Sequence, residues 1–393
     1  MSTRLRITFV LAGRGLFGGV RMVVAHGNGL IRRGHQVTIV CLRQPWPHRP
    51  RAFLKRLGRE VRAVAGLDRD HLDEFQGQLL FVEGEKLARR VPDGDVVVAT
   101  HWLTADSVAA LPGAKGTKIY FIQGFETHAF AASQIEATWQ LPMRKLVVSH
   151  WLRDQILTRV NDDQVVVVPN GISAEQFDAP PRTLRHPPTV GMAYSPAPVK
   201  GSAMAFEAIR LTRREIRDLK AICYGAGPPS REIPIPEDVA YYRRPTQSQL
   251  RDIYAGADVW LCASEKEGFA LPPLEAMGCR CPVVVTRCGG PAEFVEDGVS
   301  GFFVEVGDVN AMARQMVTVL SSEEDWARMS DAAYETARRF DMERSDRLFE
   351  QALLDATNGY NNDERTVIAE AQGAASPRSP HVTPNQREAQ RPE

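Results

Sequence analysis

Short apolar segments alternate with segments of helical periodicity in two successive rounds along this 393-residue chain. The first round begins with residues 6–12, RITFVLA, a continuous apolar run of the kind that is buried on both faces of a parallel sheet. Residues 20–35 follow, with apolar side chains at helical spacing. This alternation predicts β-α-β units, and hence a parallel sheet covered by helices. Further strands of this round are predicted at residues 36–42, 95–100, 118–123, 145–150 and 165–170.

A proline-rich stretch, residues 179–188, separates the first round from the second. The second round starts with a predicted strand at 189–194, and its later strands are predicted at residues 219–227, 258–264, 281–286 and 301–305. We therefore predict an α/β fold with two Rossmann-like domains, residues 1–178 and 186–340. Such domains, facing each other across a cleft, would bind a ligand between the carboxyl ends of both sheets. Residues 361–393 contain almost no large apolar side chain, so we expect a disordered tail.

The charges balance over the whole chain but not along it. Because 48 Lys and Arg residues face 48 Asp and Glu residues, no net field attracts nucleic acid, and we expect no nucleic-acid partner. The first 59 residues nevertheless contain twelve Arg and Lys and no acidic residue, which suits a phosphate-bearing ligand or an anionic surface. The six cysteines have no paired spacing and indicate reduced thiols. Since neither a transmembrane run nor a signal peptide is evident, we expect a cytoplasmic protein.

Residues 13–19 read GRGLFGG, and Gly13, Gly15 and Gly18 spell the G-x-G-x-x-G fingerprint of a dinucleotide-binding turn. A nicotinamide site usually has an acidic residue at the end of the second strand, and none lies there. Arg43 at that position would suit the 2′-phosphate of NADP, so this cofactor remains an alternative. A tight turn that lets helix and strand pack closely is the simpler interpretation.

A second stretch, SEKEGFALPPLEAM at residues 264–277, contains two acids separated by seven residues, Glu267 and Glu275. Pro272 and Pro273 predict the start of a short helix, because a proline loses no hydrogen bond there. Glu275 is then expected in the first turn, where the helix dipole favours a carboxylate. The preceding loop would present backbone N–H groups to an anion. Acids that accept hydrogen bonds from hydroxyls, beside N–H groups that bind phosphate, suit a polyol attached to a diphosphate.

Residues 267–308 closely resemble the E-x7-E block of retaining, nucleotide-sugar-dependent glycosyltransferases of family 4, which have the GT-B fold. Other segments resemble motifs of that family in the same order along the chain: Gly18-Gly19 with the following helix and strand, and residues 165–177, 190–201 and 338–353. The resemblance covers residues 1 to about 360. It implies a terminal helix at about 343–360 that crosses back onto the first domain. Several short segments are also similar to members that assemble bacterial surface polysaccharides.

The resemblance implies transfer of a hexosyl or deoxyhexosyl group to a hydroxyl of a glycan or lipid-linked acceptor, with retained configuration. It places Lys200 and the backbone N–H groups of Phe269, Ala270 and Leu271 at the leaving diphosphate. It also places Glu267 on the donor sugar, Glu275 on the ribose, and Gly18 and Gly19 at the opposite wall of the cleft. His101, after the strand at 95–100, is a candidate beside the acceptor. No metal and no cofactor is expected. The competing interpretations are a surface lysine at Lys200, a helix-start carboxylate at Glu275 and a structural histidine at His101.

Two positions depart from the family pattern. Ser195 stands where members usually carry an arginine for the diphosphate, so another cation would have to act there: Arg14, Arg21, Arg243 or Arg244. Gln123 stands where members often carry a histidine. The missing arginine leaves a noncatalytic nucleotide-sugar-binding protein as an alternative. Two others remain open: a GT-B relative that hydrolyses or epimerises the donor, and an NADP-dependent oxidoreductase that would use the glycine loop.

Residues 46–64 combine apolar side chains at helical spacing with six cations between Arg49 and Arg62. One interpretation is a helix that docks on anionic lipid, which would place the protein peripherally at the inner face of a membrane. The alternative, which we favour, is a helix that packs on its own sheet with a solvated basic face.

Overall fold

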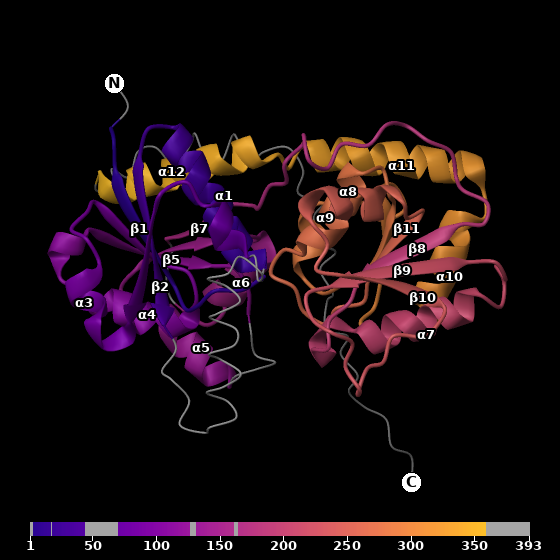
Figure 1. Ribbon diagram of the computed structural model, residues 1–393, viewed down its shortest axis with the longest axis horizontal. Helices are drawn as coiled ribbons and strands as arrows, with labels where there is room; N and C mark the ends of the chain where they lie inside the picture. Colours follow the sequence, from indigo (N-terminus) through magenta and orange to yellow (C-terminus); the bar gives the residue numbers. More distant parts are fainter. Residues whose placement is uncertain (1–2, 17, 44–69, 126–130, 161–163, 359–393) are drawn as a thin grey trace, which may run out of the picture. The chain divides into compact units, whose positions relative to one another are not determined.

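Two parallel β-sheets, one from each round of the alternation, organise the fold (Figure 1). The computed structural model describes residues 3–16, 18–43, 70–125, 131–160 and 164–358. The basic helix predicted at residues 46–64, whether packed on its own sheet or docked on lipid, and the tail predicted at 361–393 therefore lie outside the described residues. Residues 1–357 cluster as one unit, which contains both sheets.

The first sheet has the strand order β3-β2-β1-β4-β5-β6-β7 within the described part of the chain, and all neighbouring strands run parallel. Helix α1 (Gly18–Arg32) joins β1 to β2 and buries its apolar face. Helices α1 and α12 (Met342–Thr357) lie on one side of this sheet, and α4 (Trp102–Ala109) and α5 (Ala132–Trp139) on the other (Figure 1). The strands are β1 (Arg6–Leu11), β2 (Gln36–Arg43), β3 (Gln78–Glu83), β4 (Val96–Ala99), β5 (Thr117–Ile122), β6 (Arg144–Val147) and β7 (Val165–Val167).

The second sheet has the order β10-β9-β8-β11-β12-β13 among the strands described, again with parallel neighbours. The predicted α/β fold with two Rossmann-like sheets is thus confirmed. The strands are β8 (Thr189–Ala193), β9 (Lys220–Gly225), β10 (Val239–Arg243), β11 (Val259–Cys262), β12 (Val283–Thr286) and β13 (Gly301–Val304). The other helices within the described ranges are α3 (Leu87–Arg90), α6 (His150–Leu157), α7 (Ser202–Thr212), α8 (Gln247–Ala255), α9 (Leu271–Gly278), α10 (Val309–Leu320) and α11 (Glu323–Arg338).

A buried carboxylate fixes the linker to the second sheet. Asp258, at the start of β11, is fully buried. Its Oδ1 accepts hydrogen bonds from Arg182 at 2.5 Å and from Arg185 at 3.0 Å, both in the proline-rich linker. Its Oδ2 accepts a bond from the backbone N–H of Thr189 at 2.8 Å. The Arg182 guanidinium also lies over the Trp326 ring, 4.5 Å from its centroid. One acid therefore sets both the path of the linker and the first strand of the second sheet.

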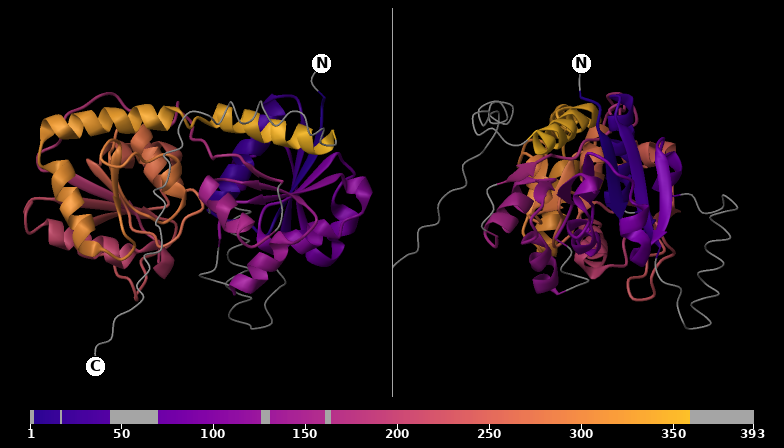
Figure 2. Two further views of the ribbon diagram at one scale, coloured as in Figure 1. Left: turned by 180° about the vertical axis from the view of Figure 1, so that it is seen from behind. Right: turned by 90° about the vertical axis from the view of Figure 1, so that its left-hand side faces the viewer.

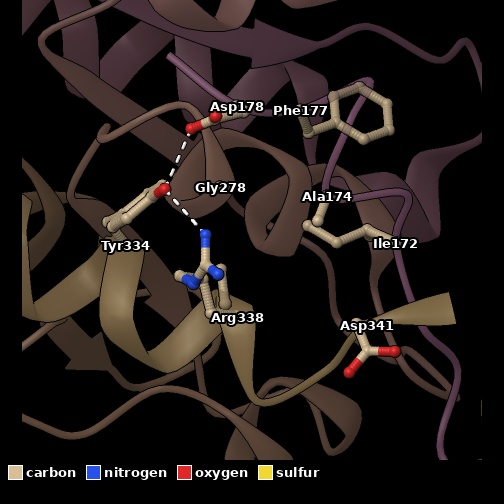
Figure 3. A pocket seen from close by; sticks show the side chains of 9 residues that line it. Ile172, Ala174, Phe177, Asp178, Gly278, Tyr334, Arg338 and Asp341 are labelled. Atoms are coloured by element: carbon tan, nitrogen blue, oxygen red, sulfur yellow. Dashed lines mark hydrogen bonds between the residues drawn. The ribbon is translucent and has the colours of Figure 1, made fainter. Parts of the chain in front are cut away.

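The chain returns from the second sheet to the first close to the place where it left. The backbone N–H of Ile172 donates to Phe340 O, and that of Met342 donates to Ile172 O, both at 2.9 Å. Beside this crossing, the Tyr334 hydroxyl donates to Asp178 at 2.9 Å and accepts from Arg338 at 3.0 Å (Figure 3). The two crossing segments are thus hydrogen-bonded to each other as well as to the domains that they join.

After this crossing, α12 packs against α1 of the first domain, as the resemblance implied (Figure 2). Asp346 Oδ1 lies 2.9 Å from Nδ1 of His26, and Glu350 Oε1 lies 2.7 Å from Nε2 of His35. The ring of Phe349 stacks on that of His26, with centroids 4.4 Å apart. All of these side chains are buried or nearly so, which makes α12 part of the core of the first domain.

Candidate functional site

Lys200 and Glu267 form an ion pair at the carboxyl edge of the second sheet. Lys200 ends a short helical turn after β8, and Glu267 follows the neighbouring strand β11. Lys200 Nζ lies 2.8 Å from Glu267 Oε1, and the Ser264 hydroxyl donates to the same oxygen at 2.8 Å. Burial by itself lowers the pKa of Lys200, but the charge and hydrogen bond of Glu267 outweigh it, so the pKa is raised. Lys200 is therefore a cation at neutral pH, and its side chain is 40% exposed.

The backbone behind this pair requires a glycine. Gly201 has a φ of +65°, in the left-handed region, and a Cβ at this position would overlap the carbonyl group of Ala263 at the end of β11. The segment of Glu267 is held in turn by the loop after β12, because its N–H donates to Cys288 O at 2.8 Å and its carbonyl accepts from Gly290 N–H at 2.9 Å. The backbone next to Lys200 is thus restricted by close packing at Gly201, and the backbone of Glu267 is held by two hydrogen bonds.

Helix α9 begins at Leu271, directly after Ala270, whose φ of +70° is rare for a residue with a side chain. The backbone N–H groups of Phe269, Ala270 and Leu271 make no hydrogen bond to any described residue. Because these three residues are buried, N–H groups without partners there favour a bound anion. The predicted helix start at the two prolines is confirmed. The predicted place of Glu275 in the first turn is wrong, because it is the fifth residue of the helix.

Glu275 is 1% exposed and joins the two domains. Its Oε2 accepts a hydrogen bond from the Tyr254 hydroxyl at 2.6 Å, and Tyr254 is bonded to Tyr224 at 2.7 Å between the hydroxyl oxygens. Its Oε1 is paired with the guanidinium of Arg21 on α1. Burial and the charge of Glu275 raise the pKa of Tyr254 well above its usual value, so this hydroxyl remains a donor. Burial lowers the pKa of Arg21, but Glu275 and the tyrosines outweigh it and the pKa is raised.

The glycine loop of the first domain lies against the loop that carries Glu267. A Cβ on Gly18 would lie 3.7 Å from Leu271 Cδ1, and a Cβ on Gly19 would lie 3.2 Å from Gln123 Nε2. That nitrogen donates to Gly19 O at 3.2 Å. A Cβ on Gly268 would overlap the carbonyl oxygen of Gln123. At Gly13 a Cβ would meet nothing within 4 Å, so close packing involves the last two glycines of GRGLFGG rather than the first.

His101 lies at the carboxyl end of β4, next to β1 in the first sheet, and caps α4. Its Nδ1 accepts the backbone N–H of Leu103 at 3.2 Å. This cap fits the structural interpretation of His101, and its place beside an acceptor stays a prediction. The structure thus brings together Lys200, Glu267, the 269–271 loop, Glu275, Gly18 and Gly19.

Sequence reasoning did not place Arg21, Tyr254, Tyr224 and Ser264 on these acids. Arg21 was one of several cations considered, and its spacing of three residues from Gly18 is the one signal that places it on the same face of α1. The two tyrosines come from β9 and α8 and show no motif. Their convergence depends on the tertiary fold.

A second contact joins the domains through His150, the first residue of α6. Its Nδ1 lies 2.8 Å from Glu293 Oε2, and its backbone N–H donates to Glu293 Oε1 at 2.7 Å. The hydrogen bond to Glu293 raises the pKa of His150, against the effect of burial. His150 thereby bridges the first domain to the loop after β12.

This contact is expected to make the stability of the protein depend on pH. A raised folded-state pKa means that the stabilisation is complete below about pH 6.5, the unfolded value, and is lost as pH rises through the folded value. Wild type is expected to melt at a higher temperature than His150→Gln under mildly acidic conditions, with the difference shrinking as pH increases. Melting curves of both proteins across this range test it, with Glu293→Gln as the partner control. A difference that stays constant with pH would contradict the assignment.

Within the described ranges, no group of three or more His, Cys, Asp or Glu side chains is arranged to hold a metal ion. Among the helices that the structure describes, none is both long and apolar enough to span a bilayer.

Two family profiles match the chain, one for each sheet. Residues 17–176 match "Glycosyltransferase Family 4", and residues 188–322 match "Glycosyl transferases group 1". The N-acetyl-alpha-D-glucosaminyl L-malate synthase of Bacillus anthracis is 36% identical over 105 residues, which are 27% of this chain and 27% of that protein. The MMP alpha-(1->4)-mannosyltransferase of Mycolicibacterium hassiacum is 27% identical over 285 residues, 70% of this chain and 67% of that protein. The chain spans about a quarter or less of the length of the first curated relatives that it matches.

The crystal structure of Anabaena HepE in complex with UDP-glucose superposes with a TM-score of 0.70 at 16% identity, covering 90% of this chain and 100% of that one. This likeness and the two parallel sheets define the GT-B fold. The profile matches on both sheets show that the chain belongs to glycosyltransferase family 4.

Proposed function

We propose that the protein transfers a sugar from a nucleoside-diphosphate sugar to a hydroxyl group of an acceptor, with retained anomeric configuration. The observation that carries this proposal is the Lys200–Glu267 pair, which lies in the same loop region as the unbonded N–H groups of Phe269, Ala270 and Leu271. A cation and N–H donors suit a leaving diphosphate, and a carboxylate suits the sugar hydroxyls.

In this mechanism negative charge grows on the diphosphate as the bond to the sugar breaks. Lys200 and the N–H groups stabilise that charge, and Glu267 binds the sugar ring. Glu275, held by Tyr254, accepts hydrogen bonds from the ribose hydroxyls. Gly18 and Gly19 allow the first domain to approach the donor without a side chain between them. No step in this scheme requires a metal ion or a further cofactor.

We infer that the acceptor is a glycan or a lipid-linked glycan and that the product enters a surface polysaccharide or glycoconjugate. The short segments that are similar to members that assemble bacterial surface polysaccharides support this inference, and one relative is named as a mannosyltransferase. The transferred group would be a hexosyl or deoxyhexosyl unit.

A donor panel tests the proposal. Melting temperature is measured with UDP-, GDP- and dTDP-sugars and with NADP, and turnover is then measured with glycan and polyprenyl-linked acceptors. We expect one class of nucleotide sugar to raise the melting temperature and to release nucleoside diphosphate only when an acceptor is present. A shift with NADP alone would indicate the oxidoreductase instead. Release without acceptor would indicate a hydrolase, and binding without turnover would indicate a noncatalytic protein.

A further inference from the structure

Arg21 reaches the second domain from the same face of α1 as Gly18. It lies three residues after Gly18, so the two positions share one side of the helix. Gly18 faces Leu271 and Arg21 contacts Glu275, which are the first and fifth residues of α9. This places the guanidinium one helical turn from the N–H groups that favour an anion.

The guanidinium has hydrogen-bonding capacity left after pairing with Glu275. Only its Nη2 contacts the carboxylate, while Nε and Nη1 make no hydrogen bond with any residue in the described part of the chain. The Arg21 side chain is 20% exposed. Because a guanidinium carries five N–H donors in a planar fork, it can hold a carboxylate on one side and a phosphate on another.

Two other candidate cations, Lys200 and Arg14, are already paired with acids. Lys200 shares its charge with Glu267 at 2.8 Å, which leaves room for a second cation at the diphosphate. Arg14 is engaged by Asp70 at 2.6 Å and lies 3.8 Å from Asp73. Arg21 combines donors that its pairing with Glu275 does not use with a place beside the 269–271 loop.

We propose that Arg21 binds the diphosphate of the donor from the first domain, while its pairing with Glu275 keeps it in place. The inference rests on the proposed function, because it assigns a ligand to a residue of that same site. Arg21 would thereby make donor binding depend on both domains, since the phosphate is held by α1 on one side and by the 269–271 loop on the other. The fork geometry favours arginine over lysine for this contact.

The affinity difference between a nucleoside diphosphate and its nucleoside isolates the phosphate contact. Dissociation constants are measured for UDP, GDP and dTDP against uridine, guanosine and thymidine, and the pair that wild type binds best is used. Arg21→Gln is expected to weaken diphosphate binding by about 10- to 100-fold, the value of a hydrogen bond between charged groups, and to leave nucleoside binding unchanged. Arg21→Lys is expected to lose less diphosphate affinity than Arg21→Gln. Arg32→Gln is the matched control, because Arg32 lies on the same helix and pairs with a buried acid, Asp346.

Two outcomes with Arg21→Gln would overturn the inference. One is an equal loss of affinity for the diphosphate and for the nucleoside, and the other is no loss of affinity for either. Since Arg21→Gln leaves Glu275 without its cation, the double variant Arg21→Gln/Glu275→Gln is compared with Glu275→Gln alone. The ratio of diphosphate affinity to nucleoside affinity is expected to be smaller in the double variant than in Glu275→Gln. An equal ratio in these two variants would show that Arg21 acts only by neutralising Glu275. If wild type transfers sugar while Arg21→Gln still binds the diphosphate as much more tightly than the nucleoside as wild type does, only this inference fails. If wild type neither transfers sugar nor prefers any diphosphate to its nucleoside, the proposed function fails.

Discussion

Replacing Lys200 with alanine is expected to lower kcat for sugar transfer by about 100- to 1,000-fold, the usual cost of removing one electrostatic contact to a group that gains charge in the transition state. The Nζ atom lies 2.8 Å from Oε1 of Glu267, the acid that we propose binds the sugar. Steady-state kinetics with the donor identified by the panel measure the effect. Glu267→Gln, which keeps the shape and removes the negative charge, is expected to show a loss of similar size.

A melting curve of Lys200→Ala distinguishes a loss of kcat from a loss of folded protein. Because Lys200 is 40% exposed, its removal is expected to leave a single cooperative melting transition close to that of wild type. Lys86→Ala is the control, since Lys86 also pairs with a glutamate, Glu83 at 2.5 Å, but on an exposed surface. A variant at Lys200 that keeps full kcat would remove the central assignment of the proposed mechanism.

Replacing Asp258 with alanine is expected to lower the free energy of unfolding by about 3–5 kcal/mol. The change leaves two arginines and the N–H of Thr189 without their acceptor in a fully buried place. Denaturant unfolding of wild type and the variant measures this loss of unfolding free energy. The matched control is Asp238→Ala, because Asp238 also pairs with an arginine, Arg213, but its side chain is 62% exposed. That pair is expected to contribute about 1 kcal/mol or less.

Equal effects of the two aspartate variants would mean that Asp258 does not organise the linker. An intermediate transition in the Asp258 variant alone would instead support its role, since the second sheet would then unfold separately from the first.

The sequence predicted the buried strands well because they are continuous apolar runs. Residues 6–12, 281–286 and 301–305 all contain strands of the observed sheets. It did not predict β3 and β10, in which one residue each, Val82 and Val239, is buried. Both strands lie at a sheet edge, where one neighbour is missing and exposed side chains interrupt the apolar pattern.

The candidate site divides in the same way. Glu267, Lys200 and the helix start at Leu271 follow strand ends that sequence patterns predict, and parallel strands bring their carboxyl ends to one edge. The Arg21–Glu275 pair joins residues 254 positions apart, and no local pattern contains that information. The error in the helical turn of Glu275 has a local cause, because α9 starts one residue before Pro272 and its first turn ends before the acid.

The packing of α12 on α1 has a consequence for the order of assembly. Residues 342–357 supply Asp346 and Glu350 to His26 and His35 and bury Phe349 in the first domain. The ribosome therefore completes the whole second sheet before it makes the helix that the first sheet needs. Until then the nascent first domain carries an uncovered apolar face, and His26 and His35 lack the acids with which they pair. Folding of the two domains is thus coupled in time as well as in space, because the first to be translated is the last to close.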